Sequence, residues 1–183
     1  MTLHRGSSYA QFALALMLLF ASSGGSATGC GRWEVDTEIR ELMSRDSAYR
    51  KGKVLVDPNP INSKALKSLI RSCGWPFVSF YGRDAALGAF LILQHSDLEV
   101  QLELAPLMRH AAGRGEILPG TLPLLEDRIL VRQGLPQIYG TQFRGDGEPY
   151  PIADMESLDI RRRAAGLVPF EAYRRQINEA QSQ

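Results

Sequence analysis

The chain has 183 residues, with 21 Lys or Arg against 20 Asp or Glu, so its formal net charge is +1. A length of this order predicts a single domain with a hydrophobic core of its own. The mixed, nearly neutral composition lacks the concentrated basic face that binding to a phosphate backbone requires. We therefore expect no nucleic-acid partner.

Residues 1–29 have the pattern of a secretory signal peptide. His4 and Arg5 give a positive start, residues 12–21 form an unbroken apolar run, and residues 22–29 are small and polar. The apolar run is about half of the roughly 20 residues that span a bilayer, which favours a signal peptide over a transmembrane anchor. We expect an exported, envelope-associated protein of the periplasm, either soluble or held by a lipid.

Cys30 and Cys73 are the two cysteines of the chain. The segment Ala27-Thr28-Gly29-Cys30 resembles a bacterial lipobox, in which the cysteine is lipidated and tethers the protein to a membrane. The alternative is cleavage near Ala27 or Ser23, after which Cys30 pairs with Cys73 in an oxidising periplasm. The sequence leaves both alternatives open.

The rest of the chain predicts a mainly α fold, a single-domain bundle of six to seven helices. Apolar residues recur at helical spacing, and breaks occur at the Pro-rich segment 57–60 and at later Gly and Pro residues. Residues 98–104 alternate strictly, as in a strand, but their Glu, Gln and Leu favour a helix. The predicted helices cover residues 33–49, 62–73, 84–95, 98–108, 122–131, 154–165 and 169–180.

One short β-hairpin is predicted near residues 137–152. Two segments, 137–143 and 150–152, are separated by the turn-forming residues 144–148. The predicted organisation is a signal peptide (1–29), a linker with an amphipathic helix (30–56), a helical domain (57–175) and a tail (176–183).

The order of several short motifs resembles an uncharacterised bacterial domain family. The motifs are GWP (74–76), ILQHSD (92–97), LEDRIL (125–130), GLPQIYGTQF (134–143), PIADMESLDIRR (151–162) and GLVPFEAY (166–173). The resemblance covers residues 57–173 and implies a shared, mainly helical fold without implying a reaction. Ser96 stands where the family usually has Ala, and Cys73 precedes GWP where no cysteine is expected.

His95 is the candidate for acid–base chemistry, because an imidazole titrates near neutral pH. Asp97 or Asp127 would orient it, and Arg128 or the Gln142 amide would hold an anion or a carbonyl group. The alternative is structural: His95 caps its helix or bonds a core carbonyl, and Asp127 and Arg128 form an internal ion pair.

The segment 137–142 adds a polar, aromatic face. In an extended chain Gln137 and Tyr139 point to the same side, which suits recognition of an amide, a sugar or a peptide backbone. The alternative is a network that holds this segment to the preceding helix. A metal site of His95, Asp97 and Asp127 is poor in histidine, and no cofactor-binding loop occurs, so neither metal nor cofactor is expected.

These observations predict a binding protein for a protein partner or a small ligand. The predicted binding residues are His95, Asp97, Asp127, Arg128, Gln137, Tyr139 and Gln142. The alternative function is a hydrolase or transferase in which His95 is the general base and Asp127 assists it. The sequence predicts no oligomeric state.

Overall fold

The computed structural model describes residues 29–181. This part contains eight helices and no β-strand, which confirms the mainly α class. The predicted count of six to seven helices is too low, because the four residues of Val78–Tyr81 are too few for a periodic signal. The helices are α1 (Arg32–Arg50), α2 (Asn59–Cys73), α3 (Val78–Tyr81), α4 (Arg83–His95), α5 (Leu98–Gly113), α6 (Thr121–Arg132), α7 (Leu158–Ala164) and α8 (Phe170–Gln181). None of the helices in this range is long and apolar enough to cross a membrane.

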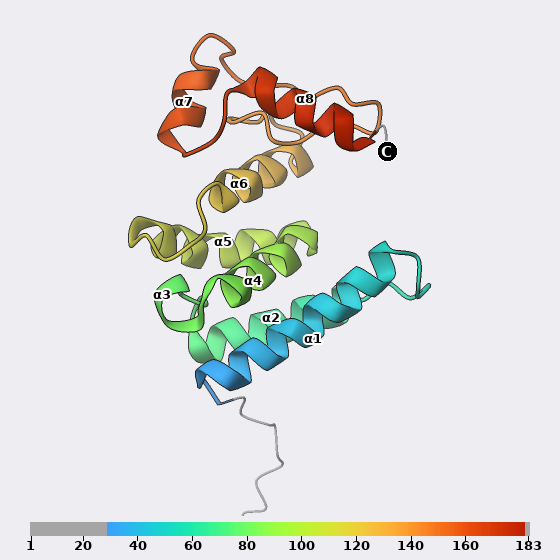
Figure 1. Cartoon of the computed structure of the whole chain (residues 1–183), viewed down its shortest axis with the longest axis vertical. Coiled ribbons are helices and arrows are strands. Elements are labelled where there is room, and N and C mark those ends of the chain that lie inside the picture. Colours follow the sequence, from blue (N-terminus) through green and yellow to red (C-terminus); the bar gives the residue numbers. More distant parts are fainter. Residues whose placement is uncertain (1–28, 182–183) are drawn as a thin grey trace, which may run out of the picture.

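Helix α4 is the centre of the bundle. It contacts α1, α2, α3, α5 and α6 (Figure 1), and its Ala89 and Leu93 are completely buried. A Cβ atom at Gly88 would clash with the side chain of Ile39, so this glycine permits α1 to approach α4 closely. The position of α4 matters for the site because its last turn carries His95.

Helix α5 covers the segment whose alternation resembled a strand, so the helical interpretation of residues 98–108 is confirmed. The helix continues through Pro106, whose side chain is exposed. Gln101 is buried and its amide nitrogen donates to the backbone oxygens of Leu93 and Gln94, at 3.1 and 3.0 Å. Helix α5 therefore satisfies carbonyl groups that the last turn of α4 leaves without helical partners.

The C-terminal helices α7 and α8 form a second, smaller packing unit at the far end of the molecule (Figure 1). Residues 133–157 connect them to the bundle. Phe170 stacks on Phe143, and the guanidinium of the buried Arg162 lies over the rings of Phe170 and Tyr173. Arg162 also donates to the backbone oxygens of Val168 and Tyr139, which joins α7 to the connecting segment.

The predicted hairpin at residues 137–152 is wrong. This segment contains two isolated bridges, Gln137 with Ile152 in parallel and Phe143 with Pro149 in antiparallel orientation, and no strand. The physical reason is that the backbone N–H groups of residues 138, 139 and 141 bond to the carboxylate of Asp127 instead of a neighbouring strand. Gly140 adopts a φ of +67°, which further breaks the extended path.

Cys30 and Cys73 form a disulfide that joins the start of α1 to the end of α2. Of the two alternatives for Cys30, the structure contains the disulfide, and a thioether-linked lipid would need the same sulfur atom. The predicted signal peptide lies outside the described residues, except for Gly29.

Candidate functional site

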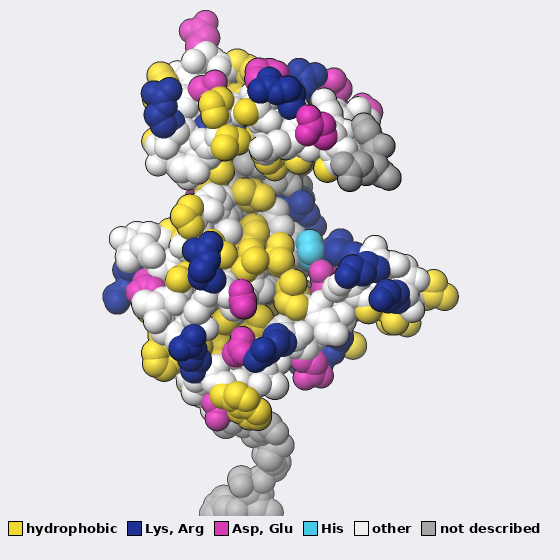
Figure 2. All heavy atoms as spheres, in the orientation of Figure 1, with side chains coloured by type: hydrophobic (Ala, Val, Ile, Leu, Met, Phe, Trp, Pro, Cys, Tyr) yellow, Lys and Arg dark blue, Asp and Glu magenta, His cyan; other side chains and the backbone are white. Residues whose placement is uncertain are grey.

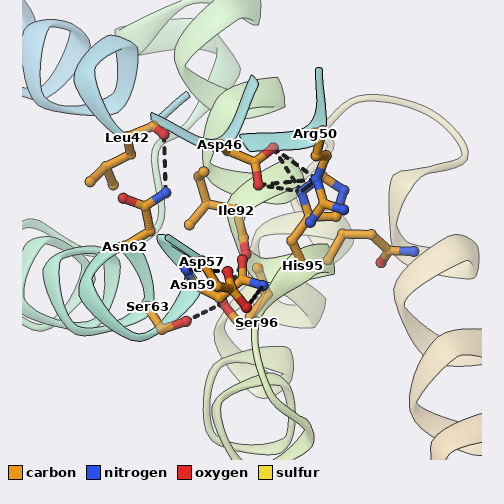
Figure 3. A network of polar contacts seen from close by, with 12 residues as sticks. Leu42, Asp46, Arg50, Asp57, Asn59, Asn62, Ser63, Ile92, His95 and Ser96 are labelled. Carbon is orange, nitrogen blue, oxygen red and sulfur yellow. Dashed lines mark hydrogen bonds and ion pairs between the residues drawn. The ribbon is translucent and has the colours of Figure 1, made fainter. Parts of the chain in front are cut away.

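His95 lies at the end of α4 against the last turns of α1. Its Nδ1 atom is 3.0 Å from both carboxylate oxygens of Asp46, and the Nε atom of Arg50 is 3.1 Å from the same two oxygens (Figure 3). Asp46 is only 3% exposed, so its charge is compensated by these two neighbours. Asp46 therefore occupies the orienting position that the sequence suggested for Asp97 or Asp127.

The end of α4 is fixed by a second contact beside this cluster. The hydroxyl of the buried Ser96 donates to the backbone oxygen of Ile92 and accepts from the hydroxyl of Ser63, both at 2.8 Å (Figure 3). These bonds tie the C-terminal end of α4 to α2. The His95 side chain thus projects from a backbone that has little freedom to move.

The pKa of His95 lies below its ordinary value of 6.5, chiefly because burial disfavours the charged imidazolium. The carboxylate of Asp46 opposes this shift, and the positive charges of Arg50 and Arg128 add to it. At neutral pH the ring is therefore predominantly neutral. Nδ1 can donate to Asp46 when it carries the ring proton, or accept from the Nε atom of Arg50, 3.0 Å away, when the proton is on Nε2.

This lowered pKa predicts that acidification destabilises the fold through His95. The unfolded chain takes up the proton near pH 6.5 and the folded chain only at lower pH, so the stabilisation is complete above 6.5 and is lost as the pH falls through the folded-state pKa. Urea unfolding of the wild type and of His95→Gln, between about pH 7.5 and about pH 5, measures the difference. The wild type should lose more stability than the variant, and equal losses would contradict the assignment.

Asp127 is completely buried and belongs to a closed network. Its carboxylate accepts from the backbone N–H groups of Ile138, Tyr139 and Thr141, at 2.7, 3.0 and 2.9 Å, and from the Thr141 hydroxyl at 2.9 Å. No ion pair joins it to Arg128 in the described part of the chain. Asp127 therefore anchors the segment 138–141 to α6, as in the alternative of a network that holds this segment to the preceding helix, and the alternative of an ion pair between Asp127 and Arg128 is wrong.

Gln137 has the same kind of role. Its amide donates to the backbone oxygens of Gln142 and Tyr150, at 3.0 and 2.9 Å, and its carbonyl oxygen accepts from the N–H of Gln142 at 2.8 Å. The side chain is completely buried and these three bonds use most of its capacity. It is therefore placed to hold the loop rather than to contact a ligand.

Arg128 connects α4, the helix that carries His95, with the loop 137–142. Its Nε atom donates to Oε1 of Gln142 at 3.1 Å, and Nη1 donates to the backbone oxygen of Gln94 at 3.3 Å. Burial, followed by the charges of Arg132 and Arg50, lowers the pKa of this guanidinium, which nonetheless remains charged at neutral pH. Arg132, one turn later on α6, donates to the backbone oxygen of Ser96.

The structure thus brings together four of the predicted residues, His95, Arg128, Gln142 and, beneath them, Asp127. Figure 2 shows a hollow between the C-terminal helices and the protruding end of α1. His95, at the end of α4, contacts Asp46 and Arg50 of α1. We call the group His95, Arg50, Arg128, Arg132 and Gln142 the His95 surface.

Two predicted binding residues lie elsewhere. Asp97 is exposed and lines a separate open groove of about 530 Å³ between α2 and the start of α5. Tyr139 is half-buried beside Arg161, its backbone is held by Asp127 and Arg162, and burial raises the pKa of its phenol. Neither side chain has a contact with His95 among the residues described.

Sequence reasoning missed Asp46, Arg50 and Arg132. For Asp46 a signal exists, because it follows Ile39 and Leu42 at helical spacing and so occupies a position where the core-facing stripe of α1 expects an apolar residue. An acid at such a position needs a buried partner. Nothing in the sequence distinguishes Arg132 from other arginines at helix ends.

The described residues contain no cluster of three or more His, Cys, Asp or Glu side chains placed to hold a metal ion. Comparison with curated proteins gave no match, and comparison with solved structures gave none either. A family model does match residues 52–183, and its description is "Family of unknown function (DUF6624)". Because this match covers most of the chain, the protein belongs to the DUF6624 family.

Proposed function

We propose that this protein is an exported, envelope-associated binding protein that captures a protein partner or a small ligand at the His95 surface. The observation that carries the proposal is the construction of this surface. Polar side chains from α1, α4, α6 and the loop 137–142 meet there, and a buried network of hydrogen bonds around Asp127 holds the loop against α6. Binding sites need such side chains held in place by packing and by a second set of hydrogen bonds.

Export is supported by the signal-like sequence of residues 1–29 and by the disulfide between Cys30 and Cys73. Disulfides persist in oxidising compartments and are rare in reducing ones. The mass of the protein isolated from a producing cell tests this part of the proposal. A mature chain that has lost the leader and carries an intact disulfide supports it, whereas a full-length chain with both thiols reduced would contradict it.

Binding is tested with a library of small ligands that contains sugars, amides, carboxylates and phosphates. Backbone NMR spectra of the isotope-labelled protein identify the residues that each compound perturbs. We expect at least one class to perturb residues of the His95 surface in the wild type and not in Arg128→Met. Ligands that bind only in the groove beside Asp97, or equally to both proteins, would contradict the assignment of the site.

A hydrolase or transferase with His95 as general base is the second candidate, and one observation favours it. Asp46 contacts Nδ1 at 3.0 Å, which is the arrangement of a base and its orienting carboxylate, and Nε2 contacts no group in the described range. No side chain placed as a nucleophile accompanies the pair among the contacts of His95, so binding is the better supported function. If the wild type hydrolysed a bound ester or amide and His95→Gln did not, the enzymatic function would become the better supported one.

A further inference from the structure

The three arginines of the His95 surface have only one acidic partner, Asp46, among the contacts of this surface. Arg128 and Arg132 form no ion pair with any described residue, and all their hydrogen-bond acceptors are neutral amide or carbonyl oxygens. The buried acid of this cluster, Asp46, already accepts from Arg50 and contacts His95. The surface therefore carries more positive than negative charge, although the chain as a whole is almost neutral.

The unused donors of these side chains are available to a ligand. A guanidinium has five N–H groups, and Arg128 uses two of them in its bonds to Gln142 and Gln94. Its third nitrogen, Nη2, takes part in no hydrogen bond among the described residues. Arg132 is exposed and follows Arg128 by one helical turn, which places both groups on the same face of α6.

Both arginines also bond to carbonyl groups at the end of α4, and this contact alone is a structural role. Basic side chains commonly stabilise the negative end of a helix. It does not explain why two guanidinium groups one helical turn apart have no carboxylate partner among the described residues. Like charges one turn apart on a helix repel, and an anion between them would reduce this repulsion.

We infer that the His95 surface binds a small ligand through an oxyanion, a carboxylate or a phosphate, held between Arg128 and Arg132. This inference rests on the proposed binding function and names its ligand class. A planar guanidinium matches such a group with two parallel hydrogen bonds. The neutral His95 ring lies next to this position and can form a hydrogen bond with a ligand hydroxyl group through Nε2, as acceptor when Nδ1 carries the proton and as donor when Nε2 carries it.

The test is a titration of the purified protein with inorganic phosphate and with citrate at constant ionic strength, followed by the NMR signals of the arginine Nε–H groups. We expect saturable shifts of the Arg128 signal with at least one of the two anions. In Arg132→Gln the dissociation constant should rise about tenfold, because one charge-assisted hydrogen bond is lost. Phosphate alone would identify a phosphate ligand, and citrate alone a carboxylate ligand.

The matched control is Arg163→Gln, which removes the same charge from an exposed position on α7. Its affinity should stay within about twofold of the wild type, as expected for a distant charge screened by salt. Arg132→Lys keeps the charge and serves if Arg132→Gln fails to fold; it should weaken binding because lysine lacks the bidentate geometry. Equal weakening in the 132 and 163 variants, or no saturation with either anion, would overturn the inference.

The outcomes also separate this inference from the proposed function. If neutral sugars or amides perturb the His95 surface while phosphate and citrate do not, the binding function stands and the oxyanion ligand is wrong. If no compound of any class perturbs this surface, both are wrong.

Discussion

Replacing Asp127 with alanine is expected to lower the free energy of unfolding by about 3–5 kcal/mol. The carboxylate is completely buried and accepts from three backbone N–H groups and one hydroxyl. In the variant these donors stay buried without an acceptor, and each such group costs roughly 1–3 kcal/mol. This loss is a large fraction of the roughly 5–15 kcal/mol by which native proteins are stable, so the variant should unfold at a much lower urea concentration than the wild type.

Urea denaturation followed by circular dichroism measures this effect. Asp97→Ala is the matched control, because it removes the same side chain from an exposed position that makes no capping hydrogen bond, and it should change stability by less than about 0.5 kcal/mol. Asp127→Asn keeps the volume but presents an NH₂ group to backbone donors, so it should also destabilise strongly. An Asp127→Ala variant as stable as the Asp97→Ala variant would show that the network around residue 127 is absent.

Reducing the disulfide between Cys30 and Cys73 is expected to cost about 4 kcal/mol of stability. The two cysteines are 43 residues apart, and closing a loop of this length restricts the unfolded chain by approximately this amount in the chain-entropy model. The bond also holds the first turn of α1 beside the end of α2, and α1 carries Asp46 and Arg50. Loss of the disulfide should therefore loosen the His95 surface as well as the fold.

Thermal unfolding with and without a reducing agent measures the contribution of the disulfide to stability. The double variant Cys30→Ser/Cys73→Ser should melt at the lower temperature of the reduced protein and should not respond to the reductant. A lipid on Cys30 would prevent the bond altogether. In that case the isolated protein would be heavier by the lipid, Cys73 would react as a free thiol, and the reductant would leave the melting temperature unchanged.

Much of the fold follows from local patterns in the sequence. Apolar spacing and proline breaks located every helix except α3, whose four residues are too few for a periodic signal. Residues 137–152 were misassigned for a different reason. Their sequence pattern is typical of an extended chain, but their backbone N–H groups bond to the carboxylate of Asp127 on α6. Local periodicity does not reveal such a long-range partner.

The candidate site was predictable in part. His95, Arg128 and Gln142 are close to one another as expected, because α4, α6 and the following loop are neighbours in the bundle. The role of Asp127 was not predictable, because a sequence does not tell whether an acidic side chain faces a ligand or buried backbone N–H groups. Asp46 lies far from His95 in the chain, and only the packing of α1 against α4 brings the two together.

Side chains from α1, α4 and α6 meet around His95. The most direct test is the pKa of His95, measured by NMR titration of its ring in the wild type, in Asp46→Asn and in Arg128→Met. Asp46 raises this pKa and Arg128 lowers it, so the first variant should have a lower pKa than the wild type and the second a higher one. A His95 pKa that neither substitution changes would contradict the meeting of these three helices at this residue.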